Sequence, residues 1–576
     1  MRKKTLAATA RRFILYSMAE TRTAAVQKKL NEMRREAEER DAERRAQKSG
    51  YPYIDLRKIP VSIEAIRLIS ESDAKEAVAA AVETKKNEVA VAAADPGSAA
   101  FTPAIKKLEG LNHEVKFFVA SKSGIEKTWE LYKFVSAEQK EITGEVDIER
   151  ERLEGLMKRL ASFQMVQDEV KKLDFKNTTT TELLEIVLAG GLAIGASDIH
   201  LEAGEKKTKI RFRLDGLLHD MFGDLPPYNY EHLVSRIKLL SGLKINVRDE
   251  AQDGRFTVGL TTKEVEVRVS IIPSEFGETI VMRLLDPDSI QADMSGLGLR
   301  KDDLELVERQ LKKPNGLILN TGPTGSGKTT TLYAFLRKAA NPEIKIITIE
   351  DPIEYRIEGI EQTQVDPEAG YTFASGLRSI LRQDPDVILV GEIRDQETAD
   401  IALQAALTGH TVYSTLHTND AAGAVPRLVD LGVKPTSIGP AVNLIIAQRL
   451  VRKLCLSCRK KIEPATELQT KIKKFLEGLP ARVNREPYGK PALYESAGCE
   501  ACGGFGYKGR IGIFEFFETG PEFEVGILKE ISEVFLKKLA EKQGMVTMQE
   551  DGILKVLSGI TSFEEVEENT GPIEWQ

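Results

Sequence analysis

The sequence has only four cysteines and no apolar run long enough to cross a membrane. A bilayer-spanning helix needs roughly 20 apolar residues, whereas the longest candidate, residues 186–196, is shorter and contains three glycines. Residues 1–19 begin with basic residues, but Arg11 and Arg12 interrupt the apolar core that a signal peptide requires. We therefore expect a cytoplasmic chain.

An excess of basic charge is also missing, since the formal net charge is -7. Nucleic-acid-binding domains normally carry a basic surface, so this balance disfavours nucleic acid as a partner. The length of 576 residues is too great for one hydrophobic core and suggests roughly three or four domains.

The first half of the chain divides by composition into an arm, a small domain and a linker. Residues 1–50 are rich in both charges and are expected to be a helical or disordered arm. Residues 51–137 read as a small α/β domain, in which 88–95 and 113–121 are expected as strands and 72–84 as a helix. Residues 138–177 are charge-rich and are predicted to be a helical linker.

The second half alternates strand and helix signals. Residues 178–295 are predicted to be an α+β domain, because 207–216 and 255–273 alternate apolar and polar residues as half-buried antiparallel strands do. Strands and helices then alternate through residue 449, which predicts a RecA-like core with a mainly parallel sheet at 296–449. Residues 450–576 carry the cysteines, followed by helices.

A nucleotide-binding loop opens this predicted core. The pattern G-x-x-x-x-G-K-[ST] is matched in full after an apolar strand and before a helical run. Its glycines allow backbone N–H groups to surround phosphate, Lys328 would reach the β- and γ-phosphates, and Thr329 would bind Mg²⁺. The residues expected to bind ATP are Gly322, Pro323, Thr324, Gly325, Ser326, Gly327, Lys328, Thr329 and Thr330.

Three more strand ends carry polar groups. Glu392 follows the apolar strand 386–390 and is expected to act on the magnesium ion, directly or through water. The segment ending at Glu354 also contains Glu350 and Asp351, and one of these acids could polarise the attacking water. His417 ends another strand and could sense the γ-phosphate. Together these ends predict one composite site.

The cysteines form two C-x-x-C pairs separated by forty residues, Cys455 with Cys458 and Cys499 with Cys502. In an intracellular protein this spacing favours a metal over disulfides. Four thiolates leave no open position on a tetrahedral zinc ion, so the predicted role is structural.

Taken in order, these motifs resemble the secretion ATPase superfamily, specifically the type IV pilus assembly and type II secretion ATPases. The resemblance rests on GPTGSGKTT, ITIEDPIEY, DPDVILVGEIRD and GHTVYSTLHTND, with ASDIHLE, AQDGRF, QRLVRKLC and GRIGIFE around them. It is specific over 178–561 and weaker over 51–132.

This resemblance implies a homo-hexamer in which Glu354 prepares the lytic water, with Glu350 as the reserve candidate. It also implies that Arg268 and Arg283 reach across subunits, while the motor domain itself carries Arg378, Arg382 and Arg394. The zinc element belongs to the assembly branch of the family and is missing from the retraction branch.

The resemblance further implies that the N-terminal domain docks on an inner-membrane platform protein, which would give peripheral membrane association through partners. Some relatives bind cyclic di-GMP through an RLG-containing motif near their start. A mixed-charge run at 28–48 stands there instead, so no cyclic di-GMP binding is expected.

The sequence thus predicts an ATP-hydrolysing motor for pilus or secretion-pseudopilus assembly. Two alternatives are a nucleotide-gated scaffold with little turnover and a nucleic-acid motor. Intact Lys328, Glu354 and Glu392 argue against the scaffold, and the acidic balance argues against the nucleic-acid motor.

Overall fold

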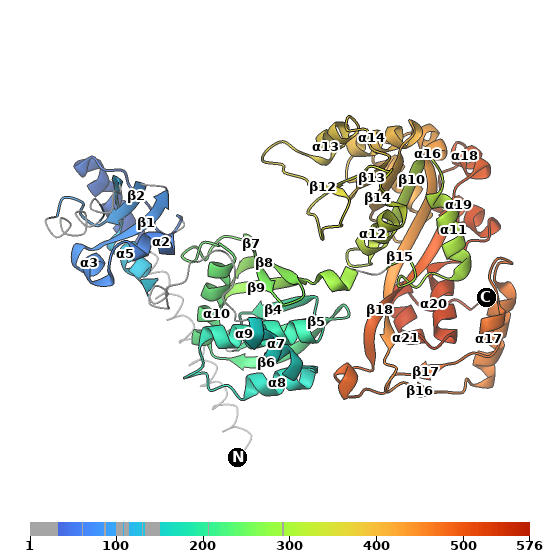
Figure 1. Cartoon of the computed structure of the whole chain (residues 1–576), viewed down its shortest axis with the longest axis horizontal. Helices are drawn as coiled ribbons and strands as arrows, with labels where there is room; N and C mark the ends of the chain where they lie inside the picture. Colours follow the sequence, from blue (N-terminus) through green and yellow to red (C-terminus); the bar gives the residue numbers. More distant parts are fainter. Residues whose placement is uncertain are drawn as a thin grey trace, which may run out of the picture.

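The computed structural model describes residues 33–59, 61–85, 88–98, 108, 114–129, 131–132, 150–205, 207–290 and 293–575. Most of the predicted arm and the first part of the predicted linker therefore lie outside the described residues. Figure 1 shows three bodies along the chain, which we call the N-terminal domain (51–132), the middle domain (150–290) and the motor domain (293–575). No helix among the described residues has both the length and the apolar character needed to cross a membrane.

The N-terminal domain is a small α/β unit, with a three-stranded sheet in the order β1-β2-β3. Strands β1 and β2 pair antiparallel, and β2 and β3 pair parallel. Its elements are α2 (Ile63–Arg67), α3 (Glu71–Ala77), β1 (Ala79–Lys85), β2 (Glu88–Ala93), β3 (Glu114–Val119) and α5 (Lys122–Trp129).

The prediction of one helix over 72–84 was wrong. Helix α3 ends at Ala77, Val78 takes a left-handed conformation with φ of 44°, and β1 follows at once. The alanines from Ala79 to Ala81 are fully buried in that strand. Burial against neighbouring elements outweighed the helix propensity of these alanines, because strand preference depends on packing context.

The middle domain packs four helices around a six-stranded antiparallel sheet in the order β6-β5-β4-β9-β8-β7. Its strands are β4 (Asp198–Glu202), β5 (Thr208–Leu214), β6 (Leu217–Leu225), β7 (Gln252–Gly259), β8 (Glu264–Ser274) and β9 (Gly277–Leu285). The helices are α7 (Arg150–Arg159), α8 (Phe163–Lys171), α9 (Thr180–Ala193) and α10 (Pro227–Leu240). The apolar run at 186–196 lies largely in α9, which is buried almost all round.

Helices α7 and α8 fall in the segment predicted as a linker. Their buried residues Leu153, Leu156, Val166 and Val170 belong to the same hydrophobic core as the sheet. The part of that segment from residue 150 onward is therefore built into the middle domain.

The motor domain is built on a seven-stranded sheet in the order β12-β11-β13-β14-β10-β15-β18. All pairings are parallel except that of β15 with β18. The strands are β10 (Gly316–Thr321), β11 (Ile346–Glu350), β12 (Glu361–Gln364), β13 (Val387–Val390), β14 (Thr411–Leu416), β15 (Val442–Leu454) and β18 (Tyr507–Glu518). A separate pair is formed by β16 (Lys460–Lys461) and β17 (Tyr494–Glu495).

The motor helices flank this sheet and extend beyond it (Figure 1). They are α11 (Lys301–Leu311), α12 (Lys328–Ala339), α13 (Phe373–Ile380), α14 (Gln396–Leu407), α15 (Ala424–Asp430), α16 (Pro435–Ala441), α17 (Thr466–Gly478), α18 (Pro521–Ile527), α19 (Glu533–Lys542), α20 (Met548–Leu557) and α21 (Phe563–Thr570). The 3-10 helices η2 (Pro287–Ile290), η3 (Glu486–Tyr488) and η4 (Glu500–Cys502) lie in connecting segments.

The boundary expected between residues 449 and 450 cuts through β15. Strand β18, from the predicted C-terminal region, pairs with β15 from Leu444 to Leu454. The C-terminal region therefore extends the motor sheet instead of forming a separate layer.

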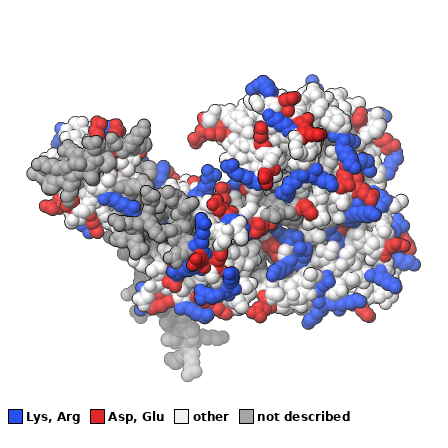
Figure 2. All heavy atoms as spheres, viewed as in Figure 1, with Lys and Arg blue, Asp and Glu red and all other residues white. Residues whose placement is uncertain are grey.

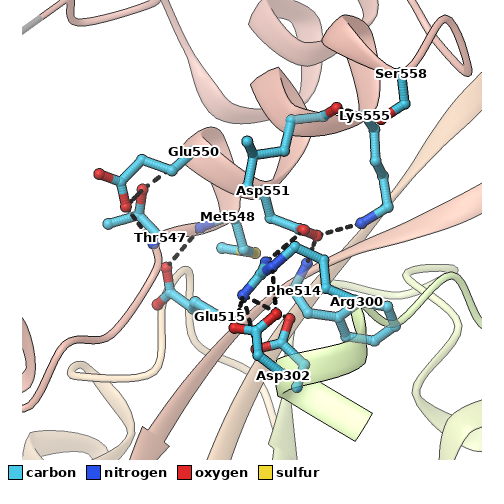
Figure 3. A network of polar contacts seen from close by, with 12 residues as sticks. Arg300, Asp302, Phe514, Glu515, Thr547, Met548, Glu550, Asp551, Lys555 and Ser558 are labelled. Carbon is cyan, nitrogen blue, oxygen red and sulfur yellow. Dashed lines mark hydrogen bonds and ion pairs between the residues drawn. The ribbon is translucent and has the colours of Figure 1, made fainter. Parts of the chain in front are cut away.

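A buried ionic network fixes the start of the motor domain to its C-terminal helices (Figure 3). Arg300 precedes α11 and contacts Asp302 at 3.1 Å, Asp303 at 2.8 Å and Asp551 of α20 at 2.6 Å. Asp551 also accepts a hydrogen bond from the Phe514 N–H at 3.0 Å. Removing one partner would leave a buried charge uncompensated, which typically costs about 3–5 kcal/mol.

Candidate nucleotide site and four-cysteine cluster

Four neighbouring strands of the motor sheet end at one cleft. Strands β11, β13, β14 and β10 are adjacent and fully buried, so polar groups can reach solvent only at their ends. The cleft has a volume of about 760 Å³ and is lined by the loop before α12 and by Glu350, Glu354, Glu392 and His417. The structure thus brings the predicted strand ends to one cleft.

The loop before α12 has the backbone of a phosphate cradle. Gly325 and Gly327 have φ of 79° and 89°, which side-chain-bearing residues rarely adopt. A Cβ on Gly322 would lie 2.5 Å from the Gln448 carbonyl oxygen. The Ser326 hydroxyl is buried and has no hydrogen-bond partner among the described residues, as expected of a group that faces a bound phosphate.

Lys328 lies folded onto this loop. Its ammonium donates to the carbonyl oxygens of Gly322 at 2.7 Å and Pro323 at 3.1 Å. Burial lowers the pKa of Lys328 to about 8, because removing an ammonium from water disfavours its charged form. A bound phosphate would supply the negative charge that restores it. Gly322 and Pro323 thus serve the site through their backbone, while Thr324 to Thr330 line the cleft.

Glu392 is held between two cationic or potentially cationic groups. Arg394 pairs with one of its oxygens, and His417 Nε2 lies 3.4 Å from the other. Glu392 and Thr329 line the same cleft and offer oxygen donors, the type of ligand that Mg²⁺ prefers. The donor set therefore fits magnesium.

Glu350 and Glu354 differ sharply in their surroundings although they are only four positions apart. Glu350 is 4% exposed and accepts hydrogen bonds from Tyr333, from Thr348 at 2.6 Å and from Gln362 at 3.2 Å. Burial raises its pKa. Glu354, by contrast, is 32% exposed and faces Arg268 of the middle domain at 3.2 Å. Glu350 is therefore occupied by hydrogen bonds within its own sheet, whereas Glu354 is accessible to water. Asp351, the third acid of the segment, also lines the cleft and pairs with Arg394 at 3.5 Å.

The middle domain contributes arginines to the cleft from its exposed sheet face. Arg268 on β8 lies opposite Arg283 on β9. Arg268 donates to Glu354 and to the Ile353 carbonyl, and Arg283 lines the nucleotide cleft, with its Nε 2.9 Å from Asp198. A second cleft of about 900 Å³ adjoins the first and contains both arginines. One chain does not test the prediction that they act across subunits; in this chain Arg283 lines the nucleotide cleft and Arg268 lines the adjoining cleft.

The family resemblance also pointed to three arginines of the motor domain, Arg378, Arg382 and Arg394. Of these three, Arg394 lines the nucleotide cleft. Arg378 pairs with Glu397 at 2.6 Å. Arg382 donates to the Arg378 carbonyl at 2.9 Å and to Ser379 at 3.0 Å. These contacts give Arg378 and Arg382 local roles in and beside α13.

The four cysteines form one cluster whose sulfur atoms all lie within 4.8 Å of one another. The Sγ atoms of Cys455 and Cys499 are 3.9 Å apart, as are those of Cys458 and Cys502, and Cys499 and Cys502 are 3.8 Å apart. Zinc–sulfur bonds of about 2.3 Å in a tetrahedron would place sulfurs about 3.8 Å apart. The arrangement fits a four-thiolate metal site.

Comparison with known proteins places most of this architecture in one family. Residues 175–568 match the family described as type II/IV secretion system protein. The chain belongs to this family. The resemblance drawn from the motifs and the predicted fold class are confirmed.

Two curated relatives of this secretion family are similar over most of their length. The type IV pilus assembly ATPase PilB of Myxococcus xanthus is 37% identical over 530 residues, covering 91% of this chain and 89% of that protein. The type II secretion system protein E of Dickeya dadantii is 45% identical over 389 residues, covering 67% and 74%. The predicted enzyme class agrees with the first name. The solved ATPase DotB of Legionella pneumophila, 23% identical with a TM-score of 0.50, covers 68% of this chain and 96% of its own length, and shows a shared fold.

Residues 49–135 match the MshEN domain family. That family is a cyclic di-GMP-binding domain, so the match is in tension with the expectation that this chain binds no cyclic di-GMP. The expectation considered only the charged run before residue 51, whereas the match covers the folded domain after it. The expectation that this chain binds no cyclic di-GMP therefore loses its support.

Sequence reasoning missed several cleft residues of this secretion ATPase, among them three charged ones. Asp198, Arg213 and Arg510 all line the nucleotide cleft. Each lies in a motif that supported the family resemblance or in a predicted strand, and the only available signal was a charged residue at an otherwise ordinary position. Their role depends on how the middle and motor domains pack against each other, and local sequence patterns do not predict that packing.

Proposed function

We propose that this chain hydrolyses ATP to power assembly of a type IV pilus or a type II secretion pseudopilus. The observation that carries the proposal is the convergence of Lys328, Glu354 and Glu392 on one cleft. The names of the two curated relatives supply the process, because one is a pilus assembly ATPase and the other a type II secretion protein.

The residues of the cleft divide the chemistry among them. Lys328 and the backbone of the glycine-rich loop bind the phosphates, and Glu354 orients water and accepts its proton. His417, beside Glu392, reports the state of the γ-phosphate by hydrogen bonding. Arg268 and Arg283 neutralise the charge that develops on the phosphate oxygens.

Two metals accompany this chemistry. Thr329 and Glu392 would hold Mg²⁺, which neutralises phosphate charge. The four cysteines would hold a structural Zn²⁺, since four thiolates leave no coordination position for substrate.

The assembled form is proposed to be a homo-hexamer at the inner face of the cytoplasmic membrane. It would associate with that membrane through an inner-membrane platform protein bound by residues 51–137. The family resemblance implied that Arg268 and Arg283 act across subunits. Because Arg268 contacts Glu354 of its own chain at 3.2 Å, we propose instead that they complete the site of the chain that carries them.

Nucleotide binding and turnover of variants test the proposal. The Glu354→Gln variant should bind ATP with near-normal affinity and fail to hydrolyse it, because only the acceptor for the water proton is lost. Arg255→Ala, in the neighbouring cleft and 3.9 Å from Glu266, serves as a surface control and should turn over normally. Normal hydrolysis by Glu354→Gln would overturn the assignment.

A further inference from the structure

The cysteine element contacts the middle domain through Phe505, which lines neither the nucleotide cleft nor the cleft that adjoins it. We define this element as residues 455–458 and 499–509. Phe505 lies three residues after Cys502, and its ring is 4.0 Å from that of His219 on β6 and 5.3 Å from that of Phe163 on α8. Phe505 also packs against the hydrophobic core of the middle domain. The element thus inserts an aromatic side chain between α8 and the middle-domain sheet.

The cysteine ligands themselves shape the loop that presents Phe505. The Gly504 N–H donates to the Cys499 carbonyl at 2.8 Å, and the Phe505 N–H donates to the Cys502 carbonyl at 3.2 Å. The Gly506 N–H donates to the Cys502 sulfur at 3.2 Å. Because the backbone on both sides of Phe505 is bonded to cysteine groups, a metal that fixes the sulfurs also fixes the aromatic ring.

A second contact joins the element to the turn between β5 and β6. The Gly509 N–H donates to the Asp215 carboxylate at 2.8 Å. Asp215 has a φ of 48° and is followed by Gly216 with a φ of 94°, so the turn has a tightly defined shape. The next residue of the element's strand, Arg510, lines the nucleotide cleft.

The turn is connected to Arg283 by consecutive polar contacts. The Gly216 carbonyl accepts a hydrogen bond from Arg213 at 2.9 Å. Arg213 lies 3.6 Å from Asp198, which accepts from Arg283 at 2.9 Å. The strand register places Asp198 directly opposite both arginines. A displacement of the turn would therefore change the position of Arg283.

We propose that the cysteine element binds the middle domain and holds it in the position in which Arg283 faces the nucleotide cleft. We call this contact between the element and the middle domain the seat. Phe505 and Asp215 are positioning residues in this arrangement, and metal binding contributes to turnover as well as to stability. The effect on turnover rests on the proposed ATP hydrolysis. The seat itself can be measured without nucleotide, which keeps a failure of the seat distinguishable from a failure of the function.

Amide hydrogen exchange on the full chain tests the seat. In Phe505→Ala, exchange over residues 213–219 should accelerate by about three- to tenfold, the worth of a lost aromatic pair, while β10 is unchanged. Removal of zinc by a chelator should accelerate the same segment. Phe563→Ala serves as the matched control, because Phe563 packs on Trp575 instead of the middle domain, and it should leave 213–219 unchanged. Unchanged exchange in Phe505→Ala would overturn the seat.

Turnover of a double variant tests the connection to Arg283. Phe505→Ala should lower kcat for ATP more than it changes KM, and it should have no further effect in an Arg283→Ala background. Asp215→Asn, which keeps an acceptor and tolerates the left-handed turn, should retain activity that Asp215→Gly loses. Equal effects of Phe505→Ala in both backgrounds would show that it acts independently of Arg283 and would overturn the connection.

Discussion

The motor sheet and the middle-domain sheet place chemistry in different ways. Strands β10, β11, β13 and β14 are buried along their whole length, and their functional groups lie beyond their carboxyl ends. Strands β8 and β9 alternate buried and accessible residues, and Arg268 and Arg283 lie on the accessible face. A sheet covered on both faces can offer polar groups only at its ends, whereas a half-covered sheet can offer them along a strand.

This difference explains why the residues of one half of the site are easier to predict from the sequence than those of the other half. Strand ends in a parallel sheet meet at a common edge, so Lys328, Glu392 and His417 could be assigned to one place from order alone. An exposed arginine on an antiparallel strand looks like any solvated residue until its partner is known. The predictions below test whether the strand ends perform the chemistry and the open face assists it.

The largest effect should come from Glu354, four residues beyond the end of β11. Glu354→Gln should reduce kcat by about 10²–10⁴-fold, the usual worth of a general base. Glu350→Gln, inside the strand, should retain turnover and lose stability, because an amide would face donors that now bond a carboxyl group. Steady-state turnover and thermal unfolding of the two variants measure the contrast. A dead Glu350→Gln with an active Glu354→Gln would reverse the roles.

Lys328 should come next. Lys328→Ala should lower kcat by about 10²–10³-fold, the range for removing one electrostatic stabiliser of the transition state, and should weaken nucleotide binding. Lys338→Ala on the same helix is the control, since Lys338 is exposed and pairs with Glu308 at 3.1 Å. Comparable losses in both variants would mean that helix stability, and not phosphate binding, explains the effect.

The cysteine cluster should affect stability strongly over a limited region. Metal analysis should find about one zinc per chain, the stoichiometry of a closed four-thiolate site. Cys499→Ser should destabilise residues 454–510 by more than about 4 kcal/mol, the size of loss expected when a structural metal is removed, while nucleotide binding at the glycine-rich loop persists. Full stability after complete chelation would contradict a structural metal.

Glu515 sharpens the comparison, because its carboxyl group is buried within β18 and does not line the nucleotide cleft (Figure 3). It accepts hydrogen bonds from the Ala421 and Met548 N–H groups. Burial raises its pKa from 4.5 to about 7, so the folded state binds a proton more readily than the unfolded state between these values.

The sign of the pH effect follows from that shift. The stability that protonated Glu515 contributes is present below pH 4.5 and is lost as the pH rises through about 7. In Glu515→Gln the free energy of unfolding should fall less over this window than in the unaltered chain, by up to about 3 kcal/mol. Chemical denaturation at a series of pH values measures the difference. Parallel pH profiles would show that Glu515 titrates normally.

The sequence predicted those parts of the site that are formed by residues close together in the chain. The glycine-rich loop, the strand ends and the cysteine spacing were all predicted from consecutive residues. The strand that begins at Ala79 was missed because burial reversed a local propensity, and the continuity of β15 across residue 449 was missed because its partner β18 lies far along the chain. Asp198, Arg213 and Arg510 were missed because two domains must pack before these residues share a cleft.

On the face drawn in Figure 2, basic and acidic side chains are interspersed over the motor domain. The nucleotide cleft is likewise lined by both acidic and basic residues, so its arginines are not distinguished by a local field of one sign. They are distinguished by what they contact, and Arg268 beside Glu354 is the clearest case.

The central claim is that one chain supplies both halves of its own site. Mixed oligomers of Arg283→Ala and Glu354→Gln chains test it most directly, after labelling has shown that both variants occupy the same ring. The structure predicts no recovery of ATP turnover, because every intact Glu354 would then lie in a chain without Arg283. Recovery of turnover in proven mixed rings would contradict the account and show that Arg283 acts on a neighbouring chain.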